Sequence, residues 1–348
     1  MVTILRTTQI SSDPRTCAII AALEEVASNV TVVCWPRLAN QEIPPDSKFT
    51  SYIPFSKVHS YGKGIRGLSK YIGWWIWAIK KIRELNPTNL VAIDLDSGII
   101  TLFMKKFYRV EYFYDQTDPM SARFSNRFLV NICDRLEKII VSNARAVTYP
   151  SKSRDRGWNA SSRIVENQFL SDEHVRKLSE LDEDPNSLFY GGLLIPGRGI
   201  DELVSIPEEE LYGFKIRVAG YGPLANRVMD AAKNTKNIFY YGELSHDDLL
   251  RMVAKSRVVL AFYDPKVSNN VNLASGKINE ARALNKIVIS NHGIGLTDKN
   301  IQLVNYEKIN VELPIILKNL RDFRDPARTK ISKSSLDEFK KFYNKEFT

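Results

Sequence analysis

The feature of this sequence that most constrains its fold is an alternation of two kinds of segment, which occurs twice along the chain. Short runs rich in β-branched and aromatic residues alternate with longer amphipathic stretches, an order typical of βαβ units and a parallel sheet. In the first half we predict strands at 2–5, 30–35, 90–94, 109–114 and 146–149, with helices such as 16–27 and 68–85. In the second half we predict strands at 187–190, 215–219, 237–241, 258–262 and 286–290. The sequence therefore predicts an α/β protein with two parallel-sheet domains.

The boundary between the two domains is expected near a polar, acidic segment at 171–186. It ends in Asp184-Pro185-Asn186 and predicts a helix followed by a turn. We therefore expect one domain at 1–170 and a second at 171–334, and the 348 residues fit two domains of ~150 residues. Residues 335–348 place apolar side chains at helical spacing with lysines between them, which predicts an amphipathic helix that packs back on the body.

Charge and cysteine content limit which partners, cross-links and cellular compartment we expect. A formal net charge of +9 favours anionic partners such as nucleotides, nucleic acid or acidic lipid, without choosing among them. The three cysteines lie far apart, so they indicate neither a disulfide framework nor a zinc cluster. We see no secretory signal, and the longest apolar run, 71–79, is far shorter than the ~20 residues of a membrane span. We expect a cytoplasmic protein, with peripheral association at the inner face of the membrane as an open alternative.

The segment from 275 to 295 is the most informative for function. Ser275 and Gly276 open a helix whose free N–H groups and dipole favour a phosphate. Lys277 lies in the first turn, where a cation is unfavourable unless an anion neutralises it. Glu280 follows on the same helix face, where its carboxylate can accept hydrogen bonds from ribose hydroxyls. On this spacing alone, a solvated Lys277 and a Glu280 that only complements the dipole remain open.

Four elements in this order resemble a known group of enzymes. They are YGGLLIPGRGIDELV at 190–204, VAGYGP at 218–223, the strand and helix at 240–265, and the Lys-x-x-Glu element at 277–280. The second half resembles the C-terminal domain of GT-B glycosyltransferases of the glycosyl transferase group 1, or family four, type, and the resemblance extends over most of the chain. It implies the GT-B fold, in which two Rossmann-like parallel-sheet domains face a cleft, with an N-terminal acceptor domain and a C-terminal nucleotide-sugar domain.

The resemblance also implies roles for individual residues. Arg198 and Lys277 would be catalytic and hold the donor diphosphate, although an ordinary solvated turn arginine remains an alternative for Arg198. Asn272 stands where many relatives have a glutamate, which leaves the donor sugar open. The expected nucleotide-sugar-binding residues are Gly192, Gly222, Gly242, Glu243, Asn272, Ser275, Gly276 and Glu280.

The first half has acidic residues at two expected strand ends. Asp94 and Asp96 form one pair, and Asp115 and Asp118 form the other. Both resemble segments that face the cleft in the family, so we expect Asp115 to orient an acceptor hydroxyl or act as a base. Strand termination and helix capping remain open for these aspartates. We expect no metal site, although Asp94-Leu95-Asp96 has the Asp-x-Asp form.

The resemblance implies a hexosyltransferase that retains configuration and needs no metal. In this class the leaving phosphate accepts the acceptor proton while basic residues stabilise its charge. The co-substrate would be a nucleotide-diphosphate sugar, with no other cofactor, and the acceptor a glycan or a lipid-linked molecule in cell-surface polysaccharide or glycoconjugate synthesis. A nucleotide-sugar epimerase of GT-B fold and a non-catalytic binder of anionic ligands remain alternatives. We expect no nucleic acid partner, and no G-x-G-x-x-G follows the first strand as in many dehydrogenases.

A basic and aromatic segment suggests where a membrane would bind. Trp74 and Trp77 lie on a predicted helix surrounded by Lys57, Lys63, Arg66, Lys70, Lys80, Lys81 and Arg83. This combination suits an anionic membrane interface. A separate helical stripe is expected to be core, and it consists of Leu68, Tyr71, Ile72, Trp75, Ile79 and Ile82.

Overall fold

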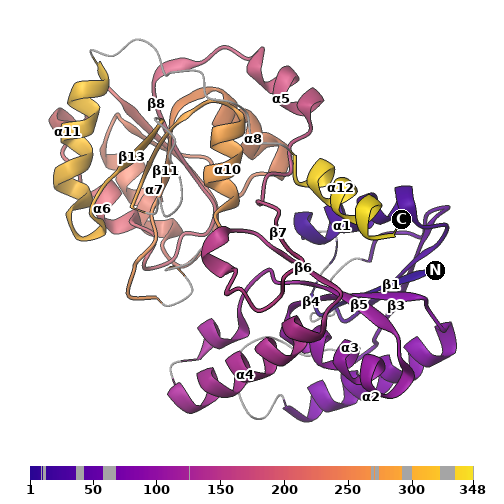
Figure 1. The fold of residues 1–348 in the computed structure, drawn as a ribbon. Helices are drawn as coiled ribbons and strands as arrows, with labels where there is room; N and C mark the ends of the chain where they lie inside the picture. Colours follow the sequence, from indigo (N-terminus) through magenta and orange to yellow (C-terminus); the bar gives the residue numbers. More distant parts are fainter. Residues whose placement is uncertain are drawn as a thin grey trace. The chain divides into compact units, whose positions relative to one another are not determined.

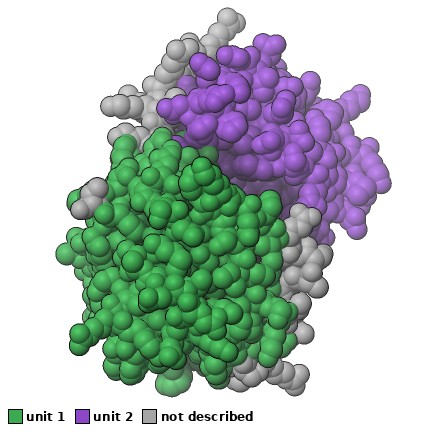
Figure 2. Space-filling view, turned by 90° about the vertical axis from the view of Figure 1, so that its right-hand side faces the viewer, with its two compact units in different colours: residues 1–169, 335–348 green, residues 170–334 purple. Residues whose placement is uncertain are grey.

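The computed structural model describes residues 1–8, 10, 13–36, 43–57, 68–124, 126–267, 270, 274–291, 300–321 and 334–347. The chain folds into two compact units, which Figure 2 shows in different colours. Unit 1 contains Met1–Phe169 and Ser335–Thr348, and unit 2 contains Leu170–Ser334.

Unit 1 is built on a seven-stranded parallel sheet in the order β3-β2-β1-β4-β5-β6-β7. Its strands are β1 (Val2–Arg6), β2 (Val30–Cys34), β3 (Thr50–Pro54), β4 (Asn89–Ile93), β5 (Glu111–Asp115), β6 (Ala146–Tyr149) and β7 (Ser162–Ile164). Its helices are α1 (Pro14–Val26), α2 (Leu68–Leu85), α3 (Asp94–Tyr108), α4 (Arg127–Asn143) and α12 (Ser335–Phe347), with short 3₁₀ turns η2 (Met120–Arg123) and η3 (Lys152–Arg154).

Unit 2 is built on a six-stranded parallel sheet in the order β10-β9-β8-β11-β12-β13. Its strands are β8 (Asp184–Gly191), β9 (Lys215–Ala219), β10 (Ile238–Tyr240), β11 (Ser256–Ala261), β12 (Ile287–Ser290) and β13 (Ile301–Leu303). Its helices are α5 (Asp172–Ser179), α6 (Ile200–Val204), α7 (Ala225–Asn234), α8 (His246–Ala254), α10 (Gly276–Ala283) and α11 (Ile309–Arg321), with η4 (Glu208–Leu211) and η5 (Tyr306–Lys308).

Both sheets follow the Rossmann strand order, in which the third, second and first strands are followed by the fourth, fifth and sixth. The prediction of two Rossmann-like parallel-sheet domains is confirmed. The prediction from the sequence did not include β3, β7 and β13, and all three lie at sheet edges. An edge strand is paired on one side only and stays partly exposed, so it lacks the continuous apolar run by which the central strands were found.

The expected turn at Asp184-Pro185-Asn186 is wrong, because these residues form the first part of β8. Proline is tolerated at the start of a strand, where few ladder hydrogen bonds depend on it. Here the pairing of β8 with β11 is irregular near Ser256. Asp184 is held in the strand by an ion pair with Arg217 on β9, at 2.6 Å.

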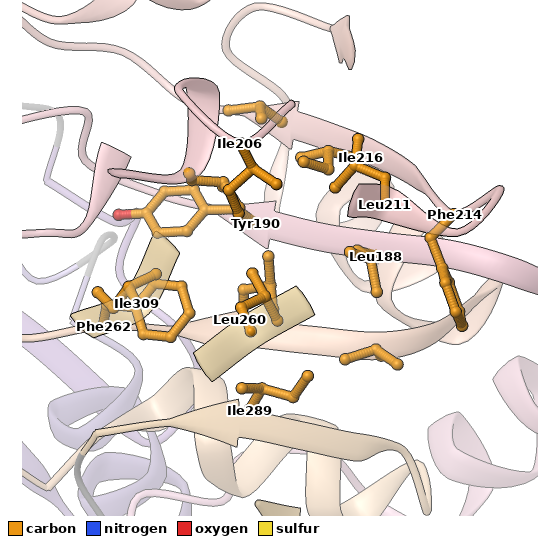
Figure 3. Packing of buried hydrophobic residues seen from close by; sticks show 14 of the residues in the cluster. Leu188, Tyr190, Ile206, Leu211, Phe214, Ile216, Leu260, Phe262, Ile289 and Ile309 are labelled. Carbon is orange, nitrogen blue, oxygen red and sulfur yellow. The ribbon is translucent and has the colours of Figure 1, made fainter. Parts of the chain in front are cut away.

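The core of unit 2 fills one face of its sheet with alternate residues of neighbouring strands. Leu188, Ile216 and Leu260 are fully buried, as expected for a parallel sheet covered by helices on both faces. Figure 3 shows Tyr190 at the end of this cluster, with its hydroxyl directed away from the aliphatic side chains. That hydroxyl donates to the carbonyl oxygen of Leu193 at 3.0 Å. The core thus fixes the aromatic ring with which β8 ends.

The C-terminal helix α12 packs against α1 in unit 1 (Figure 1). Its buried side is aromatic, with Phe339, Phe342 and Tyr343 in the same cluster as the strands β1, β2 and β4. The guanidinium of Arg15 on α1 lies 5.0 Å from the centre of the Phe339 ring. Residues distant in sequence therefore complete one face of the unit 1 sheet.

The expectation that Trp74 on helix α2 contacts a membrane is wrong. The Trp74 side chain is fully buried and stacks on Trp35 with ring centres 5.9 Å apart, so it is not available to a membrane. Trp77 is half-buried, 5.0 Å from the ring of Phe55. The buried side of the helix also includes Ala78 and Ile82. The expected core stripe is wrong for Ile72, which is exposed, because the helix turns Trp74 rather than Ile72 toward the sheet; the side chain of Leu68 lies outside the described part of the chain.

Across the described ranges, no helix combines the length and the apolar character needed to cross a membrane.

The loops at the carboxyl edge of the unit 2 sheet are joined backbone to backbone. The amide of Gly192 donates to the carbonyl of Ala219 at 2.9 Å, and the amide of Gly220 donates to the carbonyl of Gly242 at 2.7 Å. Gly220 has a φ of +145°, and a Cβ there would lie 1.8 Å from the carbonyl oxygen of Gly192. Only glycine allows this approach.

We predict that Gly220→Ala lowers the free energy of unfolding by about 2–4 kcal/mol, because the new Cβ meets rigid backbone and the φ is unfavourable. Denaturant unfolding of the full chain measures the change. The matched control is Gly276→Ala, where a Cβ would meet nothing within 4 Å. Equal stability losses in the two variants would contradict this explanation.

Candidate anion-binding site

The candidate site lies where the strand order of the unit 2 sheet reverses, at the carboxyl ends of β8 and β11. In open parallel sheets, loops at this switch point diverge and leave room for a ligand. The loop after β8 carries Arg198 between Gly197 and Gly199, both with positive φ. Helix α10, which follows β11, carries Lys277 and Glu280. We call Arg198, Lys277 and Glu280 the switch-point site.

The N-terminus of α10 is organised by Ser275 and Tyr263. The hydroxyl of Ser275 is the N-cap and accepts from the amide of Ile278 at 3.3 Å. The hydroxyl of Tyr263 lies 2.5 Å from the same Ser275 oxygen. The side chain of Asn291 holds Tyr263 in turn, since it accepts from the Tyr263 amide at 2.8 Å and donates to its carbonyl at 2.7 Å.

The ammonium of Lys277 lies over the ring of Tyr190, 4.6 Å from the ring centre. The side chain is half-buried, and it has no hydrogen bond or ion pair with any residue that the structure describes. Burial, together with the neighbouring Arg198 guanidinium, lowers the pKa of Lys277 to about 7. A Cβ at Gly192 would lie 2.7 Å from the Lys277 nitrogen, so glycine at this position leaves space for the ammonium.

Arg198 is held in the same way as Lys277, over an aromatic ring. Its guanidinium carbon lies 4.6 Å from the centre of the Tyr263 ring. Arg198 is half-buried and lacks an ion pair within the described ranges. Arg198 and Lys277 therefore share one site, each over the face of a tyrosine ring, and neither forms an ion pair with a described carboxylate.

Glu280 contributes a buried carboxylate to the same site. It is 7% exposed, and burial raises its pKa to about 7 although Lys277 acts to lower it. Among the described residues, the nearest ionisable side chain is His246, whose Nε2 lies 3.7 Å from Oε1. That distance is too long for a hydrogen bond. The carboxylate is thus free to accept bonds from a ligand.

Charged groups that are partly removed from water are costly unless they are paired. A ligand that carries two negative charges beside hydroxyl groups would satisfy Arg198, Lys277 and Glu280 together.

The structure brings together Gly192, Ser275 and Gly276 with the three charged residues of this site. Gly222 has a different role, because a Cβ there would lie 2.4 Å from the carbonyl oxygen of Leu194, so its glycine is required by backbone packing. Gly242 has a φ of +71° and open space beside it. Glu243 is exposed on the loop between β10 and α8. Asn272 lies outside the described residues.

Sequence reasoning missed Tyr190, Tyr263, Asn291 and His246 as parts of the site. The two tyrosines could have been found, because each stands at or just beyond the end of a predicted strand next to the switch point. Asn291 also follows a predicted strand, but one that does not border the switch point, and His246 had no such signal, so only their contacts in the fold place them at the site.

In unit 1, Asp115 is fully buried against Arg15. Arg15 donates to it twice, from Nη2 to Oδ1 at 2.6 Å and from Nε to Oδ2 at 2.9 Å. The hydroxyl of Thr148 is a third donor to Asp115, and Arg15 also donates to the carbonyl of Val165 at 2.7 Å. This geometry gives Asp115 a structural ion pair and does not favour the expected role as a base.

Asp94 and Asp96 bind different partners. Asp94 forms an ion pair with Arg6 and accepts from the amide of Thr117 at 2.8 Å, whereas Asp96 accepts from the hydroxyl of Thr7. In the described part of the chain, no group of three or more His, Cys, Asp or Glu side chains is arranged to hold a metal ion.

No protein-family model matches this sequence, and no curated protein matches it. Solved structures share its fold. Sucrose-phosphate synthase from Thermosynechococcus elongatus has a TM-score of 0.66 at 12% identity, over 99% of this chain and 95% of that chain. UDP-GlcNAc 2-epimerase from Methanocaldococcus jannaschii has a TM-score of 0.63 at 12% identity, over 100% of both chains. WaaG, a glycosyltransferase involved in lipopolysaccharide biosynthesis, has a TM-score of 0.59 at 14% identity, over 99% of this chain and 95% of that chain.

These similarities confirm the expected resemblance at the level of fold. The chain has the GT-B fold, with two Rossmann-like parallel-sheet units.

Proposed function

We propose that this chain is a glycosyltransferase that binds a nucleotide-diphosphate sugar in unit 2 and transfers the sugar to a hydroxyl group of an acceptor. The observation that carries the proposal is the pair of cations without a counter-ion among the described residues, Arg198 and Lys277, at the switch point. A diphosphate diester has two negative charges to match them, and ribose hydroxyls can donate to Glu280. The similarity to an epimerase named for UDP-GlcNAc and to the glycosyltransferase WaaG supports this class of co-substrate.

In the proposed reaction, the bond between the sugar carbon and the phosphate oxygen breaks, and the bonding electrons leave with the diphosphate. Arg198 and Lys277 stabilise the charge that develops on it. The departing diphosphate takes the proton of the acceptor hydroxyl as that oxygen bonds to the sugar carbon. This reaction retains the sugar's configuration and requires neither an enzymatic nucleophile nor a metal ion. Asp115 is a positioning residue that fixes Arg15 in unit 1.

We further propose that unit 1 binds the acceptor, a glycan or a lipid-linked molecule, and that the sugar transferred is a hexose. Cell-surface polysaccharide or glycoconjugate synthesis is the pathway class that this acceptor chemistry favours. WaaG, which has the same fold, is named for lipopolysaccharide biosynthesis.

The alternative function is a nucleotide-sugar epimerase, which the full-length similarity to UDP-GlcNAc 2-epimerase favours. The product of an epimerase is again a nucleotide sugar, so the reaction needs no acceptor.

We predict that Lys277→Ala and Arg198→Ala each abolish thermal stabilisation by nucleotide sugars. A ligand at a hundred times its Kd stabilises the folded chain by about 2.7 kcal/mol, and each variant removes half of the charge that holds the diphosphate. The measurement is the melting temperature of the full chain with UDP, GDP or ADP and their sugars.

The control for these variants is Lys266→Ala, which removes an exposed lysine paired with Glu307 outside the switch-point site. It should keep the full response to nucleotide. Normal nucleotide-sugar binding by both Lys277→Ala and Arg198→Ala would refute the site.

We predict that, in a Glu280→Gln background, affinity for the nucleotide sugar falls by about tenfold from pH 6 to pH 8, because Lys277 loses its charge as the pH rises through its lowered pKa. The sugar-linked diphosphate stays ionised across this range, so the protein dominates the change. Glu280→Gln removes the second group that titrates near pH 7, so titration calorimetry in that background isolates Lys277. The further change Lys277→Arg should flatten the profile, and an unchanged slope would contradict the assignment.

We predict that the nucleoside diphosphate is released from the sugar donor only when an acceptor is present, because transfer requires the acceptor hydroxyl. The measurement compares the release of nucleoside diphosphate, and the identity of the donor sugar, with and without membrane or glycan extracts as the acceptor source. Conversion of the donor to an epimer in the absence of extract would establish the alternative function.

A further inference from the structure

Helix α4 of unit 1 turns an apolar stripe to solvent. With 3.6 residues per turn, side chains three and four positions apart share one side of a helix. On α4 this side carries five exposed apolar residues, whose exposed fractions range from 36% to 70%: Phe128, Leu129, Ile132, Leu136 and Ile139. The buried residues of the helix are Glu137, Ile140 and Val141. The apolar stripe therefore lies beside the surface that packs on the sheet and is not part of it.

The charged groups beside this stripe are cationic. Arg127, Arg135 and Lys138 are exposed on α4, and none forms an ion pair with a described residue. The two acids of the helix do not offset them, since Asp134 pairs with Arg156 at 3.1 Å and Glu137 is buried, accepting from the Tyr114 hydroxyl at 2.8 Å. The exposed surface of α4 thus combines apolar side chains with positive charge that no described residue compensates.

The neighbouring helix α3 packs against α4 and exposes the same combination. Phe103 and Phe107 are 37% and 60% exposed, with ring centres 4.5 Å apart. The ammonium of Lys106 lies 5.6 Å from the centre of the Phe107 ring. Helix α3 therefore exposes an apolar and cationic group of its own.

We propose that the exposed side of α4 docks on an anionic lipid surface. The stripe would enter the boundary between headgroups and acyl chains, where apolar side chains leave water, while Arg127, Arg135 and Lys138 meet lipid phosphates. A second copy of this chain is a poorer occupant, because face-to-face pairing would bring the cations of both copies together. The proposal moves membrane contact from the buried Trp74 to α4, and it is independent of nucleotide binding in unit 2.

The test is flotation of the full chain with vesicles of phosphatidylcholine, with and without phosphatidylglycerol. We expect binding to the vesicles that contain phosphatidylglycerol and weak binding to phosphatidylcholine alone. The variant Ile132→Asn with Leu136→Asn should reduce the bound fraction at least about tenfold, because it removes two apolar side chains from the interface. Arg135→Gln with Lys138→Gln should lower binding and its salt dependence.

The matched control is Val311→Asn with Ile315→Asn on α11, two residues four positions apart that are each 57% exposed in unit 2. This control should bind vesicles as the unchanged chain does. All variants should stay folded and melt in one cooperative transition, since each replaced side chain is at least partly exposed.

The proposal is overturned if the unchanged chain binds neither kind of vesicle, or if the α4 and α11 variants bind equally well. It is also overturned if light scattering finds a dimer that the α4 variant loses while vesicle binding is absent. Nucleotide-sugar binding is measured separately on the same samples, so a failure of the proposed function would not be mistaken for a failure of lipid docking.

Discussion

The parallel pairing of β8 with both β9 and β11 is the constraint on which the candidate site depends. Parallel strands end at the same edge of a sheet, so the loops that follow them meet there. Gly192 and Gly220 let those loops touch through their backbones, and Tyr190 and Tyr263 fix an aromatic ring at the end of each strand. Arg198 and Lys277 lie over these rings. The sheet therefore positions both cations, and the helix N-terminus only adds to the field that they create.

The two units have the same strand order, but the cations near their switch points have different partners. At the switch point of unit 1, Arg6 is paired with Asp94 and Asp13, and nearby Arg15 is paired with Asp115. These buried pairs are internally neutralised, and the burial of Arg15 against Asp115 and Phe339 ties β5, α1 and α12 together. In unit 2 the corresponding cations lack such partners among the described residues. The positive charge at the switch point of unit 2 therefore favours an anionic ligand there, whereas unit 1 exposes apolar side chains on α4.

Much of the fold could be predicted because central strands of parallel sheets are buried on both faces and have continuous apolar runs. The helix at 68–85 was predicted with the bounds that the structure has. The edge strands β3, β7 and β13 were not predicted, because partial exposure interrupts the apolar pattern, and the start of β8 was not predicted because of the proline at 185. Glu280 and Lys277 could be placed together because helix geometry alone sets their spacing. The exposed side of α4 was missed, because the apolar side of an amphipathic helix is expected to pack inward, whereas on α4 it lies beside the buried side.

The sequence by itself determined the two α/β halves, the helix of Lys277 and Glu280, and the amphipathic helix at the C-terminus, because each depends on spacing within one segment. Only the tertiary structure decided which charges are paired and which aromatic rings are buried. Arg15 reaches Asp115 across a separation of 100 residues, and Trp74 is buried by Trp35 and Phe55 from other segments. Such contacts depend on how elements pack and not on the order of residues within any one of them. For that reason Arg15 forms a buried ion pair in unit 1, whereas Arg198 in unit 2 has no ion-pair partner among the described residues.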